Sequence, residues 1–391
     1  MSLSSLDPVP FVDLSWEHQT LKADLLGAVS SVLDRNDFVL GKAVAEFEAN
    51  FAIACGAGHG VGVGCGTDAI SLGLIACGIG AGDEVILPAN TFVATLIGVL
   101  HSGATPVFVD CDLETALMDL AAAEAAITPY TRAILPVHLY GQMVSPKRLL
   151  ELATAHDLLI FEDAAQAHLA AREGHQAGSV GTGAAFSFYP SKNLGGVGDG
   201  GMVTTASELV AQTVRSLRNY GATRKYYHTE SAGINSRLDT LQAAVLSLKL
   251  DYLPDWNRRR YELANYYNEQ IKPLADYGIE PIRNDSCEGH VYHLYVVRLT
   301  EACPLSRHQI QQGLAQAGIQ TGIHYPTPCH LQPAFQFLGY QPGQFPYAEA
   351  LSETIISLPM YPGLQPAQID RVAAALHQQL SETLPVTEPC Y

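Results

Sequence analysis

Between residues 51 and 205 the sequence alternates short apolar runs with stretches of helical composition. Helices are predicted at residues 68–77, 91–101, 120–127 and 146–156. The apolar runs span residues 60–63, 84–87, 106–109, 133–137, 158–161, 184–188 and 202–205. Short strands that are apolar on both faces and separated by helices are typical of a mostly parallel sheet covered on both sides. The pattern therefore predicts an α/β fold with a mostly parallel central sheet.

The rest of the 391-residue chain reads as a smaller α+β region. We expect a strand at residues 292–299, a turn-rich loop at 323–333, and helices at 238–250, 255–271, 306–317 and 366–380. A chain of this length usually folds into more than one domain. We predict a large domain over residues 1–250, including an N-terminal arm, and a small C-terminal domain over residues 251–391.

Ligands in sheets of this kind bind beyond the carboxyl ends of the strands. Lys192 lies there, between aromatic residues and a glycine-rich turn at 195–201, while Asp163 and Gln166 follow another apolar run. Pyridoxal phosphate (PLP) chemistry needs such a lysine to hold the aldehyde as a Schiff base, and a carboxylate to keep the pyridine nitrogen protonated. Apolar surroundings favour the neutral amine that this chemistry requires.

A glycine-rich turn at residues 61–70 joins a strand to a helix and contains Gly66, Thr67 and Asp68. Its free backbone N–H groups and the positive end of the helix dipole predict a phosphate site. A dinucleotide-binding fold is the alternative, but it needs an acidic residue at the end of the next strand, and here residues 83–84 precede that strand. Ser187, five residues before Lys192, is well placed to accompany the phosphate.

Three further side chains are candidates for the wall of a pocket. Phe92 opens a predicted helix, where an aromatic ring can cover a flat heteroaromatic ligand by offset stacking. His324 and Tyr325 lie in the turn-rich loop. His330 follows six residues after His324, but no third ligand accompanies this pair, so we predict no metal site.

The charge balance argues against nucleic acid and anionic membranes as main partners. The chain has 39 acidic against 22 basic residues, a formal charge of −17, and this field repels polyanions. The eight cysteines form no Cys-x-x-Cys pair, which fits thiols in a reducing compartment. No apolar run approaches the ~18 residues of a membrane span. We expect a cytoplasmic protein.

The motifs together resemble the DegT/DnrJ/EryC1/StrS aminotransferases over nearly the whole chain. The matching segments include residues 9–13, 82–86, 103–107, 137–142, 162–168, 186–201, 235–239 and 322–326. This resemblance implies PLP-dependent transferase fold type I, like aspartate aminotransferase, and activity on nucleotide-linked keto sugars. Some relatives carry histidine in place of the lysine and perform dehydration, so Lys192 places this chain with the transaminases.

The resemblance also implies a role for each residue of the site. Lys192 would be the Schiff-base lysine and proton shuttle, and Asp163 would pair with the pyridine nitrogen. The remaining cofactor-binding residues would be Gln166 at the ring hydroxyl, Phe92 on the ring, Gly66, Thr67, Asp68 and Ser187 at the phosphate end, and Asn235 reaching the phosphate from the partner subunit. The last role implies a homodimer with two shared active sites.

Two departures from the family pattern concern the substrates. Cys65 replaces a serine that is frequent in the family, with backbone donors unchanged. Tyr226 and an insertion at residues 230–232 fall in a segment expected near the sugar, which leaves the acceptor open. Tyr226, His324 and Tyr325 are the candidate substrate residues.

We predict a two-step exchange in which one pocket serves both substrates. Glutamate is the expected amino donor, and C3 of a 3-keto-6-deoxy nucleotide sugar is the favoured acceptor. The alternatives are a transaminase for a cyclitol or a keto acid, a regulatory protein of the same family and, more remotely, an NAD oxidoreductase.

Overall fold

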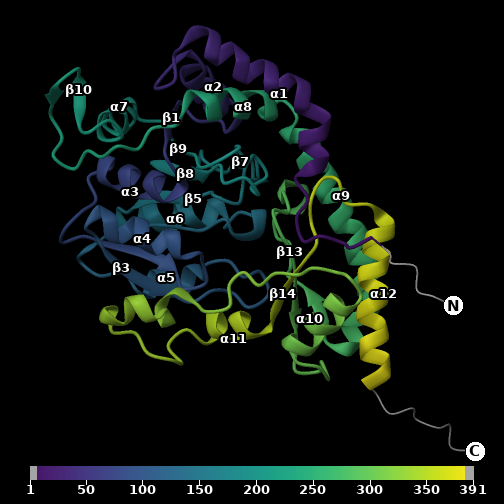
Figure 1. Ribbon diagram of the computed structural model, residues 1–391. Coiled ribbons are helices and arrows are strands. Elements are labelled where there is room, and N and C mark those ends of the chain that lie inside the picture. The colour runs from purple at the N-terminus through teal and green to yellow at the C-terminus, as the bar shows by residue number, and fades with distance from the viewer. Residues whose placement is uncertain (1–6, 384–391) are drawn as a thin grey trace, which may run out of the picture.

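A seven-stranded sheet forms the centre of the computed structural model, which describes residues 7–383 (Figure 1). The strand order is β1-β9-β8-β5-β4-β2-β3, and β9 runs antiparallel to both of its neighbours while the other pairs are parallel. The strands are β1 (His59–Val63), β2 (Glu84–Pro88), β3 (Thr105–Val109), β4 (Thr131–Ile134), β5 (Leu159–Asp163), β8 (Gly183–Ser187) and β9 (Gly201–Thr205). Each overlaps one predicted apolar run, with the largest shift at β4, which shares only residues 133–134 with the run predicted at 133–137, and the predicted α/β fold is confirmed.

Helices cover both faces of this sheet. On one face lie α3 (Gly66–Ala76), α4 (Val93–Ser102) and α7 (Glu208–Leu217), and on the other α2 (Lys42–Ala54) and α8 (Thr240–Leu250), with α1 (Ser15–Arg35) packed on α8. Gly60 of β1 allows the close approach of α2, because a Cβ there would lie 2.5 Å from the carbonyl oxygen of Glu48. Helices α5 (Leu120–Ala125) and α6 (Pro146–His156) pack together beside the sheet.

A smaller antiparallel sheet follows in the C-terminal part of the chain. It has the order β12-β13-β14. Its strands are β12 (Ile279–Pro281), β13 (Tyr295–Leu299) and β14 (Ile355–Leu358), and α9 (Leu253–Ile271), α10 (Arg307–Gln316), α11 (Pro346–Thr354) and α12 (Pro366–Thr383) surround it. Two hairpins, β6 (Ala171–Arg172) with β7 (His175–Gln176) and β10 (Ala222–Arg224) with β11 (Tyr227–His228), complete the strands. The 3-10 turns are Leu139–Gly141, Lys272–Tyr277, Cys287–Gly289, Cys329–Leu331 and Pro333–Leu338.

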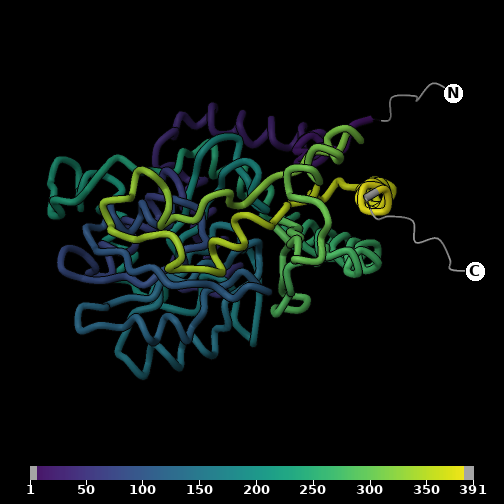
Figure 2. The backbone as a smooth tube through the Cα atoms, turned by 90° about the horizontal axis from the view of Figure 1, so that it is seen from below, coloured from purple at the N-terminus to yellow at the C-terminus, as the bar shows by residue number. Residues whose placement is uncertain are grey.

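The first described residues pack against this C-terminal part. The Val9 N–H donates to the Gly318 carbonyl at 2.8 Å, and the Gln320 N–H donates to the Val9 carbonyl at 3.0 Å. Val9 is fully buried in the same apolar cluster as β13 and β14. The backbone trace likewise places the N-terminal segment beside the C-terminal elements (Figure 2). The division at residue 250 stays a prediction.

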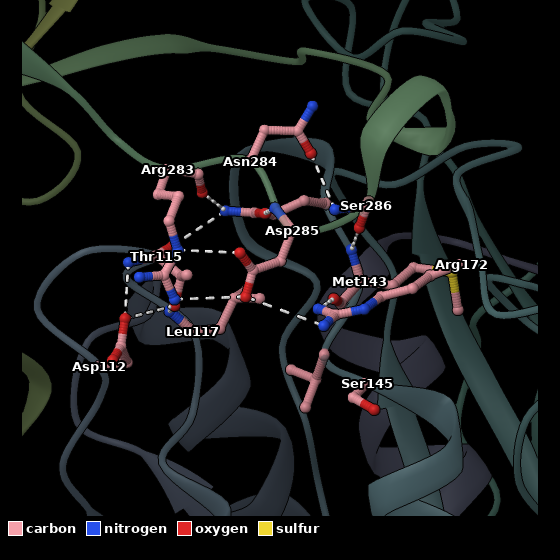
Figure 3. A network of polar contacts seen from close by, with 12 residues as sticks. Asp112, Thr115, Leu117, Met143, Ser145, Arg172, Arg283, Asn284, Asp285 and Ser286 are labelled. Carbon is pink, nitrogen blue, oxygen red and sulfur yellow. Dashed lines mark hydrogen bonds and ion pairs between the residues drawn. The ribbon is translucent and has the colours of Figure 1, made fainter.

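A charged network fastens the segment before β13 to loops of the large sheet (Figure 3). The Asp285 carboxylate forms an ion pair with the Arg283 guanidinium at 2.9 Å and lies 3.8 Å from the Arg172 guanidinium. The Gln142 amide donates to the carbonyls of Thr115 and Arg283 at 3.0 and 3.1 Å. These contacts hold residues 283–286 in place. His293, which follows this segment in the chain, enters the cavity described below. None of the helices within residues 7–383 is long and apolar enough to cross a membrane.

Candidate active site

A cavity of about 500 Å³ lies beyond the carboxyl ends of the strands, where the sequence places the chemistry. Most of the predicted site residues line it: Gly66, Thr67, Phe92, Asp163, Gln166, Ser187, Lys192, His324 and Tyr325. Two clefts of about 740 and 770 Å³ lie elsewhere, and neither contains Lys192 or Asp163. We therefore place the site in the smaller cavity.

Lys192 lies in a tight turn that follows β8. The Lys192 N–H donates to the Tyr189 carbonyl and the Gly196 N–H to the Phe188 carbonyl, each at 2.8 Å. Within residues 7–383 the Lys192 amine has no hydrogen-bond or ion-pair partner. Burial lowers the pKa of Lys192 to about 8, against the opposing effect of the Asp163 charge. A substantial fraction of this amine is therefore neutral at mildly alkaline pH.

Asp163 is the last residue of β5, and its carboxylate is buried and fixed. One oxygen accepts from the Thr95 hydroxyl at 2.7 Å, and the other accepts from the Ala165 N–H at 3.1 Å. Burial raises the pKa of Asp163, while these two donors and the Lys192 charge oppose the rise. Thr95, in the first turn of α4, was missed as a site residue by sequence reasoning, because a threonine in a helix gives no signal of its partner.

Gln166 is held from both ends of its amide. Its Oε1 accepts from the Tyr140 N–H at 2.6 Å, and its Nε2 donates to the Tyr325 hydroxyl at 3.0 Å. The Tyr325 ring lies 5.3 Å from the Phe92 ring, centroid to centroid, and Phe92 is half exposed. The loop at residues 323–325 is thus tied to the sheet side of the cavity.

The turn after β1 brings the N-terminus of α3 into the cavity. The Cys65 thiol caps this helix by accepting from the Asp68 N–H at 3.5 Å. Gly66 lies against Ser187, since a Cβ at Gly66 would be 2.8 Å from the Ser187 Cβ. Asp68 itself does not line the cavity; its carboxylate accepts from the Ser236 hydroxyl at 2.6 Å. Asp68 therefore braces the turn.

Two further predicted residues lie outside the cavity of their own chain. Tyr226 is 85% exposed, in the turn between β10 and β11. Asn235 is exposed and pairs with Asn219 through an isolated antiparallel bridge. Their predicted roles toward a substrate and a partner subunit stay predictions.

His293 lines the cavity and was not anticipated as a site residue. It falls within the predicted strand at 292–299, but β13 begins only at Tyr295, so His293 lies in the irregular segment before it. No sequence pattern marks that break. Within the described residues no group of three or more His, Cys, Asp or Glu side chains is arranged to hold a metal ion.

Comparison with known proteins gives consistent matches over most of the chain. The DegT/DnrJ/EryC1/StrS aminotransferase family matches residues 19–377. The erythromycin biosynthesis sensory transduction protein EryC1 of Saccharopolyspora erythraea is 46% identical over 94% of this chain and 98% of its own length. The dTDP-3-amino-3,4,6-trideoxy-alpha-D-glucose transaminase of Streptomyces venezuelae is 44% identical over 95% of this chain and 96% of its own.

Solved structures agree with these relatives. The crystal structure of S. venezuelae DesV in complex with a ketimine intermediate has a TM-score of 0.90 at 43% identity, covering 95% of this chain and 98% of DesV. The ntda protein from Bacillus subtilis, with bound cofactor PMP, has a TM-score of 0.87 at 32% identity, covering 97% of this chain and 87% of its own. The sheet order, the cavity and these matches together assign the chain to the DegT/DnrJ/EryC1/StrS aminotransferase family.

Proposed function

We propose that this chain is a PLP-dependent aminotransferase that moves an amino group from an amino acid to the keto group of a nucleotide-diphosphate sugar. One observation carries the proposal. The Lys192 amine has no partner within residues 7–383, its pKa is lowered to about 8, and it shares a cavity with the fixed carboxylate of Asp163.

The donor set of the cavity supports PLP as the cofactor. Lys192 supplies an amine for the aldehyde and Asp163 a carboxylate for the ring nitrogen. The Gln166 amide suits the ring hydroxyl, the half-exposed Phe92 suits the ring face, and Thr67, Ser187 and the N-terminus of α3 suit the phosphate. PLP, when bound, acts as an electron sink for the carbon that carries the amino group.

Different side chains around the cavity transfer the proton and orient the cofactor. Lys192, with a pKa near 8, can take a proton from the substrate carbon and return it. The Thr95 and Ala165 donors favour the charged form of Asp163 by opposing the rise in pKa that burial causes, and this carboxylate would stabilise a proton on the ring nitrogen. Gln166, anchored by Tyr140 and Tyr325, would orient the ring through its hydroxyl.

The relatives favour a sugar acceptor over a cyclitol or a free keto acid. The S. venezuelae relative is named as a transaminase of a dTDP-3-amino sugar, and we infer C3 of a nucleotide-linked keto sugar as the acceptor here. Glutamate is the proposed donor, and both substrates use the same cavity in turn. The EryC1 name supports a regulatory role as a second candidate, but the formal charge of −17 disfavours direct DNA binding.

The exposed surface supports a homodimer in which each subunit completes the other's site. Asn235 lies outside its own cavity, and large apolar side chains are exposed near it in sequence and by strand pairing. They are Phe38, Val39, Leu40, Tyr226, Tyr227 and Ile234. Burial of these groups against a second copy would bring Asn235 toward the neighbouring cavity.

Two half-reactions test the proposal. Purified protein is loaded with PLP and mixed with L-glutamate, and the cofactor absorbance and released 2-oxoglutarate are measured; a dTDP-linked 3-keto sugar is then added. We expect conversion in both steps for wild type, and none for Lys192→Ala. Lys147→Ala removes an exposed lysine of α6 and serves as the matched control with wild-type rates. Failure of wild type to convert glutamate or any other amino acid would exclude the proposal.

A further inference from the structure

His293 lies two residues before β13 and lines the same cavity as Lys192. Its side chain is buried, and the proposed function gives it no role. The chemistry that His293 offers depends on which ring nitrogen carries the proton, and that proton can be assigned from its partners.

A buried chain of amides fixes the partner of His293. The Asn257 Nδ2 donates to the His168 carbonyl at 2.9 Å, which turns the Asn257 Oδ1 toward Asn193. The Asn193 Nδ2 in turn donates to the Asn257 Oδ1 and to the Val291 carbonyl, both at 2.9 Å. Because carbonyl oxygens only accept, neither amide can be reversed without losing these hydrogen bonds.

The Asn193 Oδ1 is therefore the atom that faces the Nδ1 of His293, at 3.1 Å. An oxygen acceptor at this distance requires a hydrogen on Nδ1. Burial, together with the nearby charges of Lys192 and Arg260, lowers the pKa of His293 well below its ordinary value, so the ring is neutral. A neutral imidazole with its proton on Nδ1 has a bare lone pair on Nε2.

The Nε2 atom has no hydrogen-bond partner within residues 7–383, and it is not among the unpartnered polar atoms of this region that are fully buried, so it keeps some exposure in a residue that lines the cavity. A bare nitrogen lone pair accepts from N–H or O–H groups. It repels a carboxylate oxygen, which brings no hydrogen. This wall of the cavity is therefore selective for hydrogen-bond donors.

We propose that His293 Nε2 accepts a hydrogen bond from the amino group of the donor amino acid in the first half-reaction and from that of the aminated sugar product in the second, forming an amine-selective subsite. The inference rests on the proposed function, in which an amino acid enters the cavity and an aminated nucleotide sugar leaves it. The amino group is what this donor substrate and this product share. Asn193 and Asn257 are positioning residues that act through the His293 tautomer.

The tautomer is tested directly by nuclear magnetic resonance. PLP-loaded protein is labelled with 15N-histidine, and the His293 signals are assigned by their loss in His293→Gln. We expect a protonated Nδ1 and a bare Nε2 at neutral pH. A hydrogen on Nε2, or a doubly protonated ring, would overturn the inference without any use of the enzyme's activity.

Ligand selectivity is tested by binding. L-glutamate is compared with glutarate, which lacks the amino group, and a dTDP-3-amino sugar is compared with the same nucleotide sugar lacking the amine. We expect His293→Leu to weaken binding of both amine ligands by about tenfold, as for a lost hydrogen bond to a charged group. Glutarate and the amine-free sugar should bind as they do to wild type.

His293→Gln supplies an amide oxygen as acceptor, and we expect it to recover part of the amine preference. Equal weakening of amine and amine-free ligands would mean a merely structural role and would sink the inference. If wild-type protein transaminates but both variants keep the wild-type preference, the subsite is wrong and the proposed function stands. If wild type does not transaminate, the proposed function itself fails.

Discussion

The Thr95 hydroxyl donates to the Asp163 carboxylate across 2.7 Å, joining the first turn of α4 to the end of β5. Thr91 lies two residues before α4, with its hydroxyl 2.7 Å from that of Thr95. Both threonines are buried, so this hydrogen bond is shielded from solvent and opposes the rise in the pKa of Asp163 that burial causes. Thr95 thus sustains the charge that the ring nitrogen of the proposed cofactor needs.

Thr95→Val should weaken the enzyme by raising the pKa of Asp163. The variant keeps the shape of the side chain and removes a hydrogen bond to a charged group, a loss of about 2 kcal/mol. Since the hydroxyl lowers the pKa of Asp163, its removal moves the acidic limb of the kcat/KM profile to higher pH. The profile between pH 4 and 8 checks this. An acidic limb that stays in place or moves to lower pH would contradict it.

Lys192→Met should stabilise the cofactor-free protein. The pKa of Lys192 falls from 10.5 to about 8 on folding, so at pH 7 the buried ammonium costs about 3 kcal/mol. A group whose pKa is lowered by folding binds more protons in the unfolded state, so the stability of wild type rises with pH between about 8 and 10.5. Urea unfolding at pH 7 and 9 should therefore show the advantage of Lys192→Met shrinking at pH 9. A constant advantage would contradict the pKa shift.

Mixed dimers test whether Asn235 serves the neighbouring cavity. Lys192→Ala and Asn235→Ala are each expected to lose most activity. If Asn235 acts across the interface, subunit exchange between the two variants creates dimers with one intact site, and activity returns to about a quarter of wild type at random pairing. If Asn235 acts within its own subunit, or the protein is a monomer, mixing restores nothing. Size-exclusion chromatography with light scattering gives the oligomeric state independently.

Arg218→Met should destabilise the fold by about 3–5 kcal/mol, because it leaves the buried Glu48 carboxylate without its partner. Arg218 pairs with Glu48, which also accepts from the Gly62 N–H at 2.8 Å in β1, just before the glycine-rich turn. The exposed pair of Lys42 and Glu46 is the matched control, and Glu46→Gln should change the free energy of unfolding by less than about 1 kcal/mol. Urea unfolding compares both variants, and similar effects would refute the distinction.

Much of the fold follows from the sequence because its strands are apolar throughout. The seven runs could be read without knowing their neighbours, and the fold, the family and the transaminase class are confirmed. Helices α1, α2, α7 and α11 were not predicted. In α1 only Glu17, Leu21 and Val32 are buried, so the sequence shows no apolar stripe. Glu17 forms an ion pair with the buried Lys249 of α8 at 3.3 Å, a contact that the sequence alone does not reveal.

Some residues of the site could likewise be predicted from the sequence, and others could not. Lys192, Asp163 and Gln166, which line one cavity, could be predicted as site residues because each stands out against an apolar or glycine-rich background. Asp68 was predicted to bind the cofactor, but it lies outside the cavity and accepts from Ser236, a partner 168 residues away. Thr95 and His293 could not be predicted, because their partners Asp163 and Asn193 are distant in sequence and no local pattern marks either residue.

The pairing of Val9 with residues 318 and 320 has a consequence for biosynthesis. A ribosome must release more than three hundred residues before Val9 meets its neighbours. The segment around Val9 therefore stays unpaired until residues 318–320 have left the ribosome, so this pairing can form only late in the synthesis of the described chain. A chain truncated before residue 318 would leave that apolar segment without a place to dock, ready for capture by chaperones or proteases.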